Sequence, residues 1–261
     1  MIVRSESGVD FNVEIRGSRP RAVFVHGFAD DLHTWDGLWS ALDGSLAALR
    51  YDLRGCGASV THRQIPFRHA DDLLMVLDAA GIDRCHLIGV SMGGGIALNF
   101  ALDHPERVRN LVLVSPHLVG WEWSAAWLAL WNPIVQHARA GEMEEARRLW
   151  WEHPLFETTR TSAAGPALRA SIMRMTREQL TDDRHQPMLP DVERLHTLTT
   201  RTLLMTGERD LEEFRVIAAL LEASVSDLER VDEPTRGHLL HLEDPEECAR
   251  RISSFLASNN G

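Results

Sequence analysis

The chain has 261 residues and a formal net charge of −11, a length that suits one large α/β domain or two small ones. The negative charge argues against nucleic-acid and membrane-surface partners, since both select a basic footprint. Three widely spaced cysteines, an odd number, predict no disulfide framework and a reducing compartment. There is no apolar leader after Met1 and no run near the roughly 18 apolar residues of a membrane span, so we expect a soluble cytoplasmic protein.

Short apolar runs alternate with helix-period segments from the N-terminus onward, which predicts an α/β fold with a mostly parallel sheet flanked by helices. Residues 11–15 alternate like an edge strand, whereas residues 21–25 read as a buried strand. Apolar positions at helical spacing predict helices near residues 73–80 and 214–221, and a last helix that begins at Asp244. Further strands are expected at residues 46–51, 85–90, 108–114 and 202–206 and near Leu228.

This rhythm breaks at Pro116 and resumes at residue 202, roughly 85 residues later, which is too long for a plain connection. The interval is helix-like and holds most of the tryptophans, so we interpret it as an inserted helical cap. The prediction is therefore a first core part at residues 1–117, a cap at 118–198 and a second core part at 199–261.

The central motif is Gly-Val-Ser-Met-Gly at residues 89–93, between a strand-like run and a helix-like run. A serine on such a tight turn sits in a strained conformation, so its neighbours Gly89 and Gly93 must lack side chains. The turn would place the Ser91 hydroxyl at the positive end of a helix dipole. With its matching strand and helix, this segment resembles the nucleophile elbow of the α/β-hydrolase superfamily.

The superfamily orders its catalytic residues as serine, acid and histidine, and the resemblance implies Ser91, Asp210 and His238 in these roles. Asp210 follows the strand at residues 202–206, at the sheet edge where such folds gather their sites. His238 follows Gly237 in a segment similar to the family's histidine loop. Asp210 could instead cap a helix, in which case Glu208 or Asp232 would be the acid.

The resemblance also implies an oxyanion hole, which needs two backbone N–H groups. One comes from Met92, the residue after the serine. The other comes from Phe28, because residues 26–28, His-Gly-Phe, are similar to the family's His-Gly-x loop. A further hallmark, D-x-R-G-x-G-x-S, is matched at residues 52–59. We expect His26 to have a structural role in the oxyanion loop.

Other reactive side chains point to no second chemistry. His241 is expected to be a packed or hydrogen-bonded neighbour of the site, and Cys56 a turn residue. No metal site is predicted, since neither H-E-x-x-H nor C-x-x-C occurs.

The cap sequence bears on the substrate. Trp123, Trp127 and Trp131 fall on one helix face, which could be core or pocket wall, and we take Trp127 as substrate-binding. The rings and the cap methionines favour apolar groups. A carboxylate substrate would be favoured instead if one of the cap arginines faced inward, which are Arg160, Arg169, Arg174 and Arg177.

The combined prediction is a serine hydrolase that cleaves a carboxylic ester or lactone of a small to mid-sized, largely apolar molecule through an acyl-serine, with no cofactor. A serine at position 91 argues against the dehalogenase and epoxide-hydrolase branches, which use aspartate there. Two alternatives stay open: a carbon–carbon bond hydrolase or cofactor-free perhydrolase on the same triad, and a non-catalytic ligand receptor. The expected partner is the small-molecule substrate, and the sequence leaves a homo-oligomer open.

Overall fold

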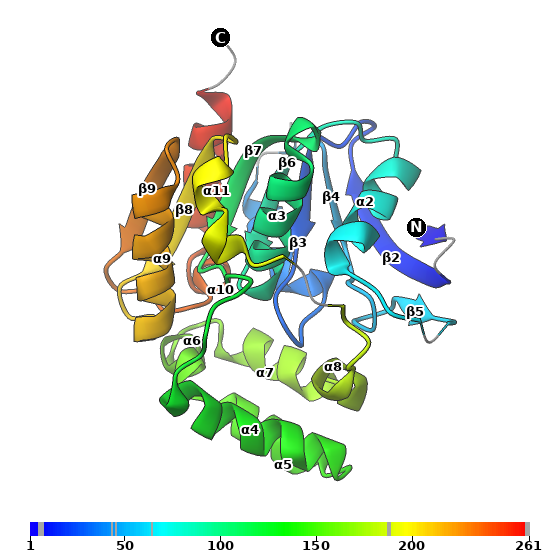
Figure 1. Ribbon diagram of the computed structural model, residues 1–261, viewed down its shortest axis with the longest axis vertical. Coiled ribbons are helices and arrows are strands. Elements are labelled where there is room, and N and C mark those ends of the chain that lie inside the picture. Colours follow the sequence, from blue (N-terminus) through cyan, green and yellow to red (C-terminus); the bar gives the residue numbers. More distant parts are fainter. Residues whose placement is uncertain (5–7, 43, 45, 64, 187–188, 259–261) are drawn as a thin grey trace.

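The computed structural model describes residues 1–4, 8–42, 44, 46–63, 65–186 and 189–258, and one nine-stranded sheet runs through them (Figure 1). Its strands are β1 (Ile2–Arg4), β2 (Val9–Arg16), β3 (Ala22–Val25), β4 (Ala48–Tyr51), β5 (Val60–Thr61), β6 (Cys85–Val90), β7 (Val108–Val114), β8 (Thr202–Gly207) and β9 (Leu228–Glu233).

The strands follow the order β1-β2-β4-β3-β6-β7-β8-β9, and β5 pairs with β2. All pairs from β4 across to β9 are parallel, whereas β2 is antiparallel to β1, β4 and β5. The continuous apolar runs of β3 and β8 are fully buried, as expected for strands covered on both faces. The predicted α/β class with its mostly parallel sheet is confirmed.

The prediction of an edge strand at residues 11–15 is wrong. β2 has β4 on one side and β1 and β5 on the other. Its side chains alternate between buried and half-exposed because one face of the strand is covered and the other is not. Such alternation in the sequence shows which face is covered, but it does not show whether other strands lie on either side. The short strands β1 and β5 were not expected, since three and two residues are too few to form a readable pattern.

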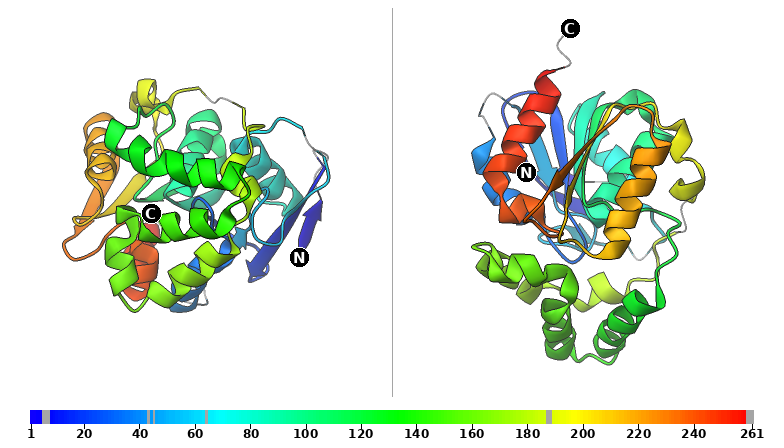
Figure 2. Two further views of the ribbon diagram at one scale, coloured as in Figure 1. Left: turned by 90° about the horizontal axis from the view of Figure 1, so that it is seen from below. Right: turned by 90° about the vertical axis from the view of Figure 1, so that its left-hand side faces the viewer.

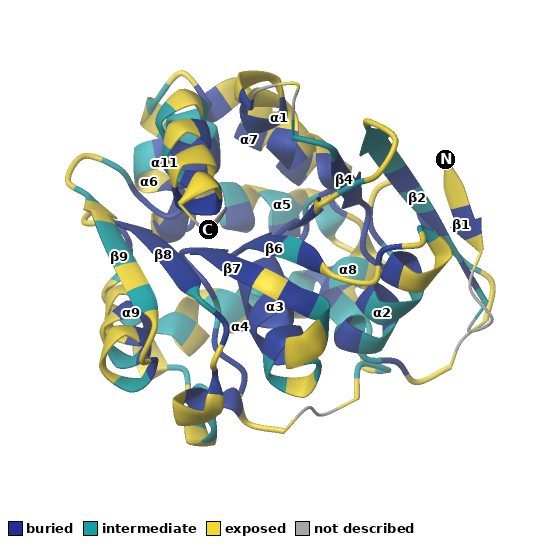
Figure 3. Cartoon of the chain, turned by 90° about the horizontal axis from the view of Figure 1, so that it is seen from above, coloured by how far each residue is buried: buried dark blue, intermediate teal, exposed yellow. Residues whose placement is uncertain are grey.

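Two groups of helices cover the two faces of the sheet (Figures 2 and 3). In Figure 3, α1 and α11 lie on one face, and α2, α3 and α9 lie on the other. The bounds of the core helices are α1 (Asp36–Ala41), α2 (His69–Ala79), α3 (Met92–Asp103), α9 (Glu212–Ser224), α10 (Leu240–Glu243) and α11 (Pro245–Ala257).

Five more helices connect β7 to β8 and lie together beyond one end of the sheet, at the bottom of Figure 1. They are α4 (Ala125–Arg139), α5 (Met143–Glu152), α6 (Glu157–Thr161), α7 (Gly165–Arg174) and α8 (Arg177–Thr181). All of them fall inside the interval for which the sequence predicts helices. The division of the chain into core and cap at residues 117 and 198 stays a prediction.

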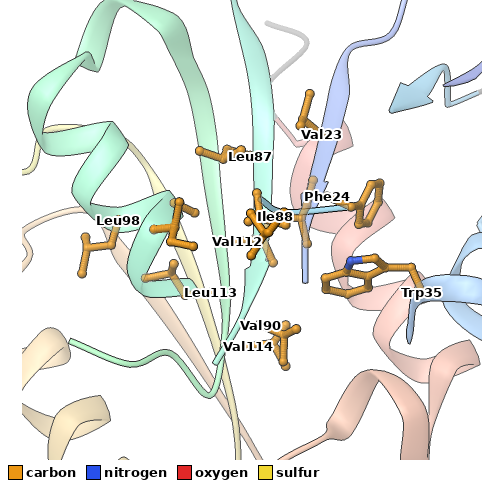
Figure 4. Packing of buried hydrophobic residues seen from close by; sticks show 14 of the residues in the cluster. Val23, Phe24, Trp35, Leu87, Ile88, Val90, Leu98, Val112, Leu113 and Val114 are labelled. Carbon is orange, nitrogen blue, oxygen red and sulfur yellow. The ribbon is translucent and has the colours of Figure 1, made fainter. Parts of the chain in front are cut away.

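Buried side chains pack on both faces of the sheet where β6 and β7 run side by side (Figure 4). Ile88 and Val112 are fully buried there, with Leu98 of α3 to one side and Trp35 to the other. The Phe24 ring meets the Trp35 ring at a centroid distance of 5.3 Å. Burying an aliphatic side chain such as that of Ile88 or Val112 contributes about 1.5–3 kcal/mol to stability. The centre of the sheet is therefore a rigid base for the loops that follow its strands.

The turn between β6 and α3 depends on backbone contacts that only glycine allows. A Cβ on Gly93 would lie 2.2 Å from the Val25 carbonyl oxygen and 2.3 Å from that of His26. A Cβ on Gly89 would lie 2.3 Å from the Gly93 carbonyl oxygen. These obstacles are backbone atoms, which a change of side-chain rotamer cannot move. Helix α3 can pack this close to β3 and β6 only because residues 89 and 93 have no side chain.

We predict that Gly93→Ala lowers the free energy of unfolding by about 3 kcal/mol, because α3 and β3 must separate to admit the methyl group. Chemical denaturation measures this change. Gly44→Ala is the matched control, since a Cβ there meets no atom within 4 Å. Equal stability of the two variants would contradict the packing argument.

Candidate active site

Ser91 holds an unusual backbone conformation, with φ of 51° and ψ of −119°, between the last residue of β6 and the first of α3. Among the described residues, the other non-glycine residues with positive φ are Ala29 (54°) and Ser115 (41°), which follow β3 and β7. All three come after neighbouring strands at one edge of the sheet. Strained residues gather at functional sites, so this edge is the candidate site. The strain at Ala29 and Ser115 has no sequence signal, because neither residue type indicates positive φ.

The loop after β3 lies beside the serine. A Cβ on Gly27 would be 3.5 Å from the Ser91 Cβ. Met92 is the first residue of α3, so its N–H belongs to the group of helix-start donors that have no acceptor within the helix. Phe28 and Met92 both line the cavity that contains Ser91. The two residues predicted to form the oxyanion hole therefore flank the serine, and their role stays a prediction.

His26 joins the loop after β3 to the loop after β4. The Leu53 N–H donates to its Nε2 at 2.9 Å, so the ring proton lies on Nδ1, which is 2.8 Å from the Gly27 carbonyl oxygen. The side chain is fully buried. His26 thus bridges the loops after β3 and β4 through hydrogen bonds, which is a structural arrangement of the kind that the sequence predicts.

Asp210 and His238 form a buried pair. His238 Nδ1 donates to Asp210 Oδ2 at 2.9 Å, and each side chain is only 1% exposed. The second oxygen of Asp210 accepts the Leu211 N–H at 2.7 Å. Helix α9 begins at Glu212 with Leu211 as its N-cap residue, so Asp210 is not the helix cap. His238 Nε2 is buried and has no hydrogen-bond partner among the described residues, so the Ser91 hydroxyl is not bonded to it in this structure.

The other two acid candidates lie elsewhere. Glu208 is exposed. Asp232 is exposed and accepts hydrogen bonds from the Thr206 hydroxyl and the Arg230 guanidinium. Of the three acids that the sequence leaves open, Asp210 is the one that the structure places against His238.

Ser91 and His238 line a single cavity of about 310 Å³. Its walls are mostly apolar, and Trp127 and Trp131 of α4 each contribute a ring to them. Trp123 also lines the cavity but lies before the first residue of α4, so the prediction that it shares a helix face with the other two is wrong. Trp123 and Trp127 stack at a centroid distance of 4.3 Å, and the Phe214 ring lies 4.2 Å from that of His238. Trp127 therefore lies where the prediction requires, beside the serine and histidine, and its binding role stays a prediction.

The described residues that line the cavity include no arginine. None of the four cap arginines is among its described lining residues. Arg160 donates to the carbonyls of Trp151 and His153, and Arg174 pairs with Asp31. His117 does line the cavity, but burial lowers its pKa to about 4, so its ring is neutral near pH 7. The alternative of a carboxylate substrate held by an inward arginine has no support here.

Two groups near the site have no signal in the sequence. Glu243 of α10 accepts the Gly237 N–H at 2.8 Å and the Thr159 hydroxyl at 2.6 Å, so it ties the His238 loop to α6. Phe214 reads as an ordinary core residue of α9, yet its ring faces His238. Both placements depend on how α6 and α9 pack, which local patterns do not report.

The remaining reactive groups lie apart from this chemistry. His241 is fully buried with its Nε2 2.8 Å from the Thr34 hydroxyl, which makes it a hydrogen-bonded neighbour as expected. Cys56, Cys85 and Cys248 are free and buried, and burial raises the pKa of Cys56 to about 12. Within the described ranges no cluster of three or more metal-ligating side chains occurs. None of the described helices is long and apolar enough to span a membrane.

With this geometry established, comparison with known proteins identifies the family: the chain belongs to the α/β-hydrolase fold family, whose model matches residues 20–245. Curated relatives match over shorter stretches. A provisional carbamate hydrolase, RutD, of Caulobacter vibrioides is 39% identical over 92 residues, 33% of this chain and 32% of that protein. A fluoroacetate dehalogenase of a Burkholderia species is 33% identical over 113 residues, 41% of this chain and 37% of that protein. The chain thus spans about a third of the length of these relatives.

Solved structures match over nearly the whole chain. A hydrolase from Pseudomonas aeruginosa PA01 aligns with a TM-score of 0.83 and 25% identity, covering 98% of this chain and 97% of that one. An enol-lactonase from Burkholderia xenovorans LB400 aligns with a TM-score of 0.80 and 20% identity, covering 96% and 97%. At that identity the second match shows the fold alone.

We predict that the free energy of unfolding of Ser91→Gly is about 1 kcal/mol higher than that of Ser91→Ala, because glycine adopts the observed φ and ψ without the steric cost of a Cβ atom. Thermal and chemical denaturation measure the difference. Ser253, exposed within α11, is the control: there the glycine variant should be the less stable by about 1 kcal/mol. The same order at both positions would show that Ser91 is unstrained.

Proposed function

We propose that the chain is a serine hydrolase that cleaves a carboxylic ester or lactone of a small to mid-sized, largely apolar molecule. One observation carries the proposal: Ser91 and His238 line the same apolar cavity, and Asp210 binds the far side of the His238 ring. A hydroxyl nucleophile needs a base, and the base needs an orienting group. These three side chains supply that set.

In the proposed reaction, Asp210 holds the proton of His238 on Nδ1, which leaves Nε2 free to accept the Ser91 proton. The Ser91 oxygen attacks the carbonyl carbon, and the Phe28 and Met92 N–H groups stabilise the resulting oxyanion. His238 returns its proton to the leaving alcohol, and an acyl-serine forms. Water then attacks the acyl carbon with His238 as base, which releases the acid and restores Ser91 without any cofactor.

Several alternatives use the same residues. The Burkholderia relative is named for dehalogenation, whereas the family resemblance drawn from the sequence implies aspartate in that branch at the position of Ser91. Hydrolysis of a carbon–carbon bond, cofactor-free perhydrolysis and ligand binding without turnover stay open. A cytoplasmic location, the absence of nucleic-acid and membrane partners, and the oligomeric state also stay predictions.

Product analysis on a panel of esters, lactones and diketones tests the proposal. We expect turnover of an ester or lactone, a loss of about 10⁶ in kcat for Ser91→Ala and of about 10⁴ for Asp210→Asn. Asp232→Asn is the matched control and should stay near wild type, because this carboxylate is exposed and bonds other groups.

Three outcomes would overturn the proposal in different ways. Cleavage of diketones alone would replace it with carbon–carbon hydrolysis. A folded wild-type protein that turns over nothing on the panel would favour the receptor alternative. If Asp210→Asn lowers kcat only slightly while Asp232→Asn lowers it strongly, the acid of the triad is Asp232 and not Asp210.

For the cavity wall we predict that kcat/KM on p-nitrophenyl esters rises with acyl length, by up to about 0.8 kcal/mol per methylene, until the cavity is full. Trp127→Ala should flatten this rise while retaining turnover of the acetate. Trp151→Ala is the control, since Trp151 is half-buried outside the cavity. An unchanged length profile in Trp127→Ala would show that Trp127 is merely structural.

A further inference from the structure

Asp30 lies in the wall of the Ser91 cavity, two residues after Phe28 on the loop that follows β3. Among the described residues that line this cavity it is the one acidic side chain, and no arginine or lysine accompanies it. Placing a carboxylate against an apolar cavity is costly unless something compensates for the lost water. The catalytic scheme above gives Asp30 no task.

The groups around Asp30 are arranged for an ionised carboxylate. Its Oδ1 accepts the Ser171 hydroxyl of α7 at 2.6 Å and the Asp31 N–H at 2.9 Å. The Thr34 hydroxyl is a third partner. Such bonds favour the charged form. Burial acts in the opposite direction and raises the pKa of this carboxyl overall, so the nearby His26 and these hydrogen bonds offset only part of the cost.

The neighbouring wall is aromatic. Phe28, Trp131, Trp150 and Phe156, which we call the aromatic wall, all line the cavity. The Phe28 ring lies 5.2 Å from that of Trp131 and 5.9 Å from that of Trp150. Trp150 meets Phe156 at 4.8 Å. Ring faces attract cations through their quadrupoles. This attraction offsets part of the free energy that a cation loses when it leaves water, which a purely aliphatic site does not do.

We propose that this cavity selects a substrate that carries a positively charged ammonium group, held by the Asp30 carboxylate and the aromatic wall. A carboxylate and several rings around one space provide the two attractions that an ammonium group uses, charge and cation–π contact. The same carboxylate repels an anionic substrate. The substrate class is therefore an ester or lactone of an amino or quaternary-ammonium compound, a refinement that rests on the proposed function for turnover but not for binding.

Binding without turnover gives the first test. Choline and its uncharged carbon analogue 3,3-dimethyl-1-butanol are titrated into the protein with tryptophan fluorescence as readout. A pH of about 8 is used because burial raises the pKa of Asp30 and alkaline conditions favour its ionised form. We expect choline to bind at least about tenfold more tightly than the analogue. Asp30→Asn, which keeps the shape and removes the charge, should abolish that preference.

Two control variants keep the test sharp. Asp31→Asn removes an adjacent carboxylate that pairs with Arg174 and does not line the cavity, so it should retain the preference. Asp183→Asn removes an exposed carboxylate that does not line the cavity, so it should also retain the preference. Equal binding of choline and the analogue to the wild type, or an unchanged preference in Asp30→Asn, would overturn the inference.

Turnover gives the second test and separates this inference from the proposed function. Acetylcholine should be hydrolysed with a kcat/KM at least about tenfold above that of 3,3-dimethylbutyl acetate, and Asp30→Asn should equalise them. If choline binds through Asp30 but no ester is cleaved, the ammonium site stands and the hydrolase proposal fails. If both esters are cleaved equally, the hydrolase proposal stands and the ammonium site fails.

Discussion

The backbone strain at Ser91 is the constraint on which the site depends. A non-glycine residue with φ of 51° costs about 1–3 kcal/mol and persists only when its surroundings leave no alternative. Here the surroundings are the buried strands β6 and β7 and the start of α3, pressed onto β3 through glycines that have no room for a side chain. The core thus supplies the free energy that holds one hydroxyl above the sheet edge.

The same edge separates two kinds of carboxylate by their surroundings. Asp210 is buried behind His238 and bonded to its ring, so its charge is directed at an imidazole. Asp30 faces the cavity and is bonded only by neutral donors, so its charge remains available to whatever enters. In our proposals one carboxylate orients a base and the other selects a ligand, so their different surroundings would give two identical groups in one site different tasks.

Much of the fold could be read from the sequence because its central strands are buried on both faces and appear as continuous apolar runs. The Gly-x-Ser-x-Gly turn could also be predicted, since its strained backbone requires particular residue types.

The features that the sequence does not predict have physical reasons too. The edge assignment of residues 11–15 failed because alternation reports which face is covered and not which strands are adjacent. The stripe that contains Trp127 left core and pocket open because a helix face does not reveal what covers it. Asp30 carried no signal, since only the packing of α7 against its loop places it in the cavity wall.

The central claim is that Ser91 is a nucleophile activated by His238 and Asp210. Mass spectrometry of the protein after reaction with a fluorophosphonate tests this most directly, because the reagent forms a stable bond only with an activated hydroxyl. We expect one adduct per chain, on the peptide that contains Ser91, and none in Ser91→Ala. No labelling of the folded protein, or an adduct on another residue that persists in Ser91→Ala, would contradict the account.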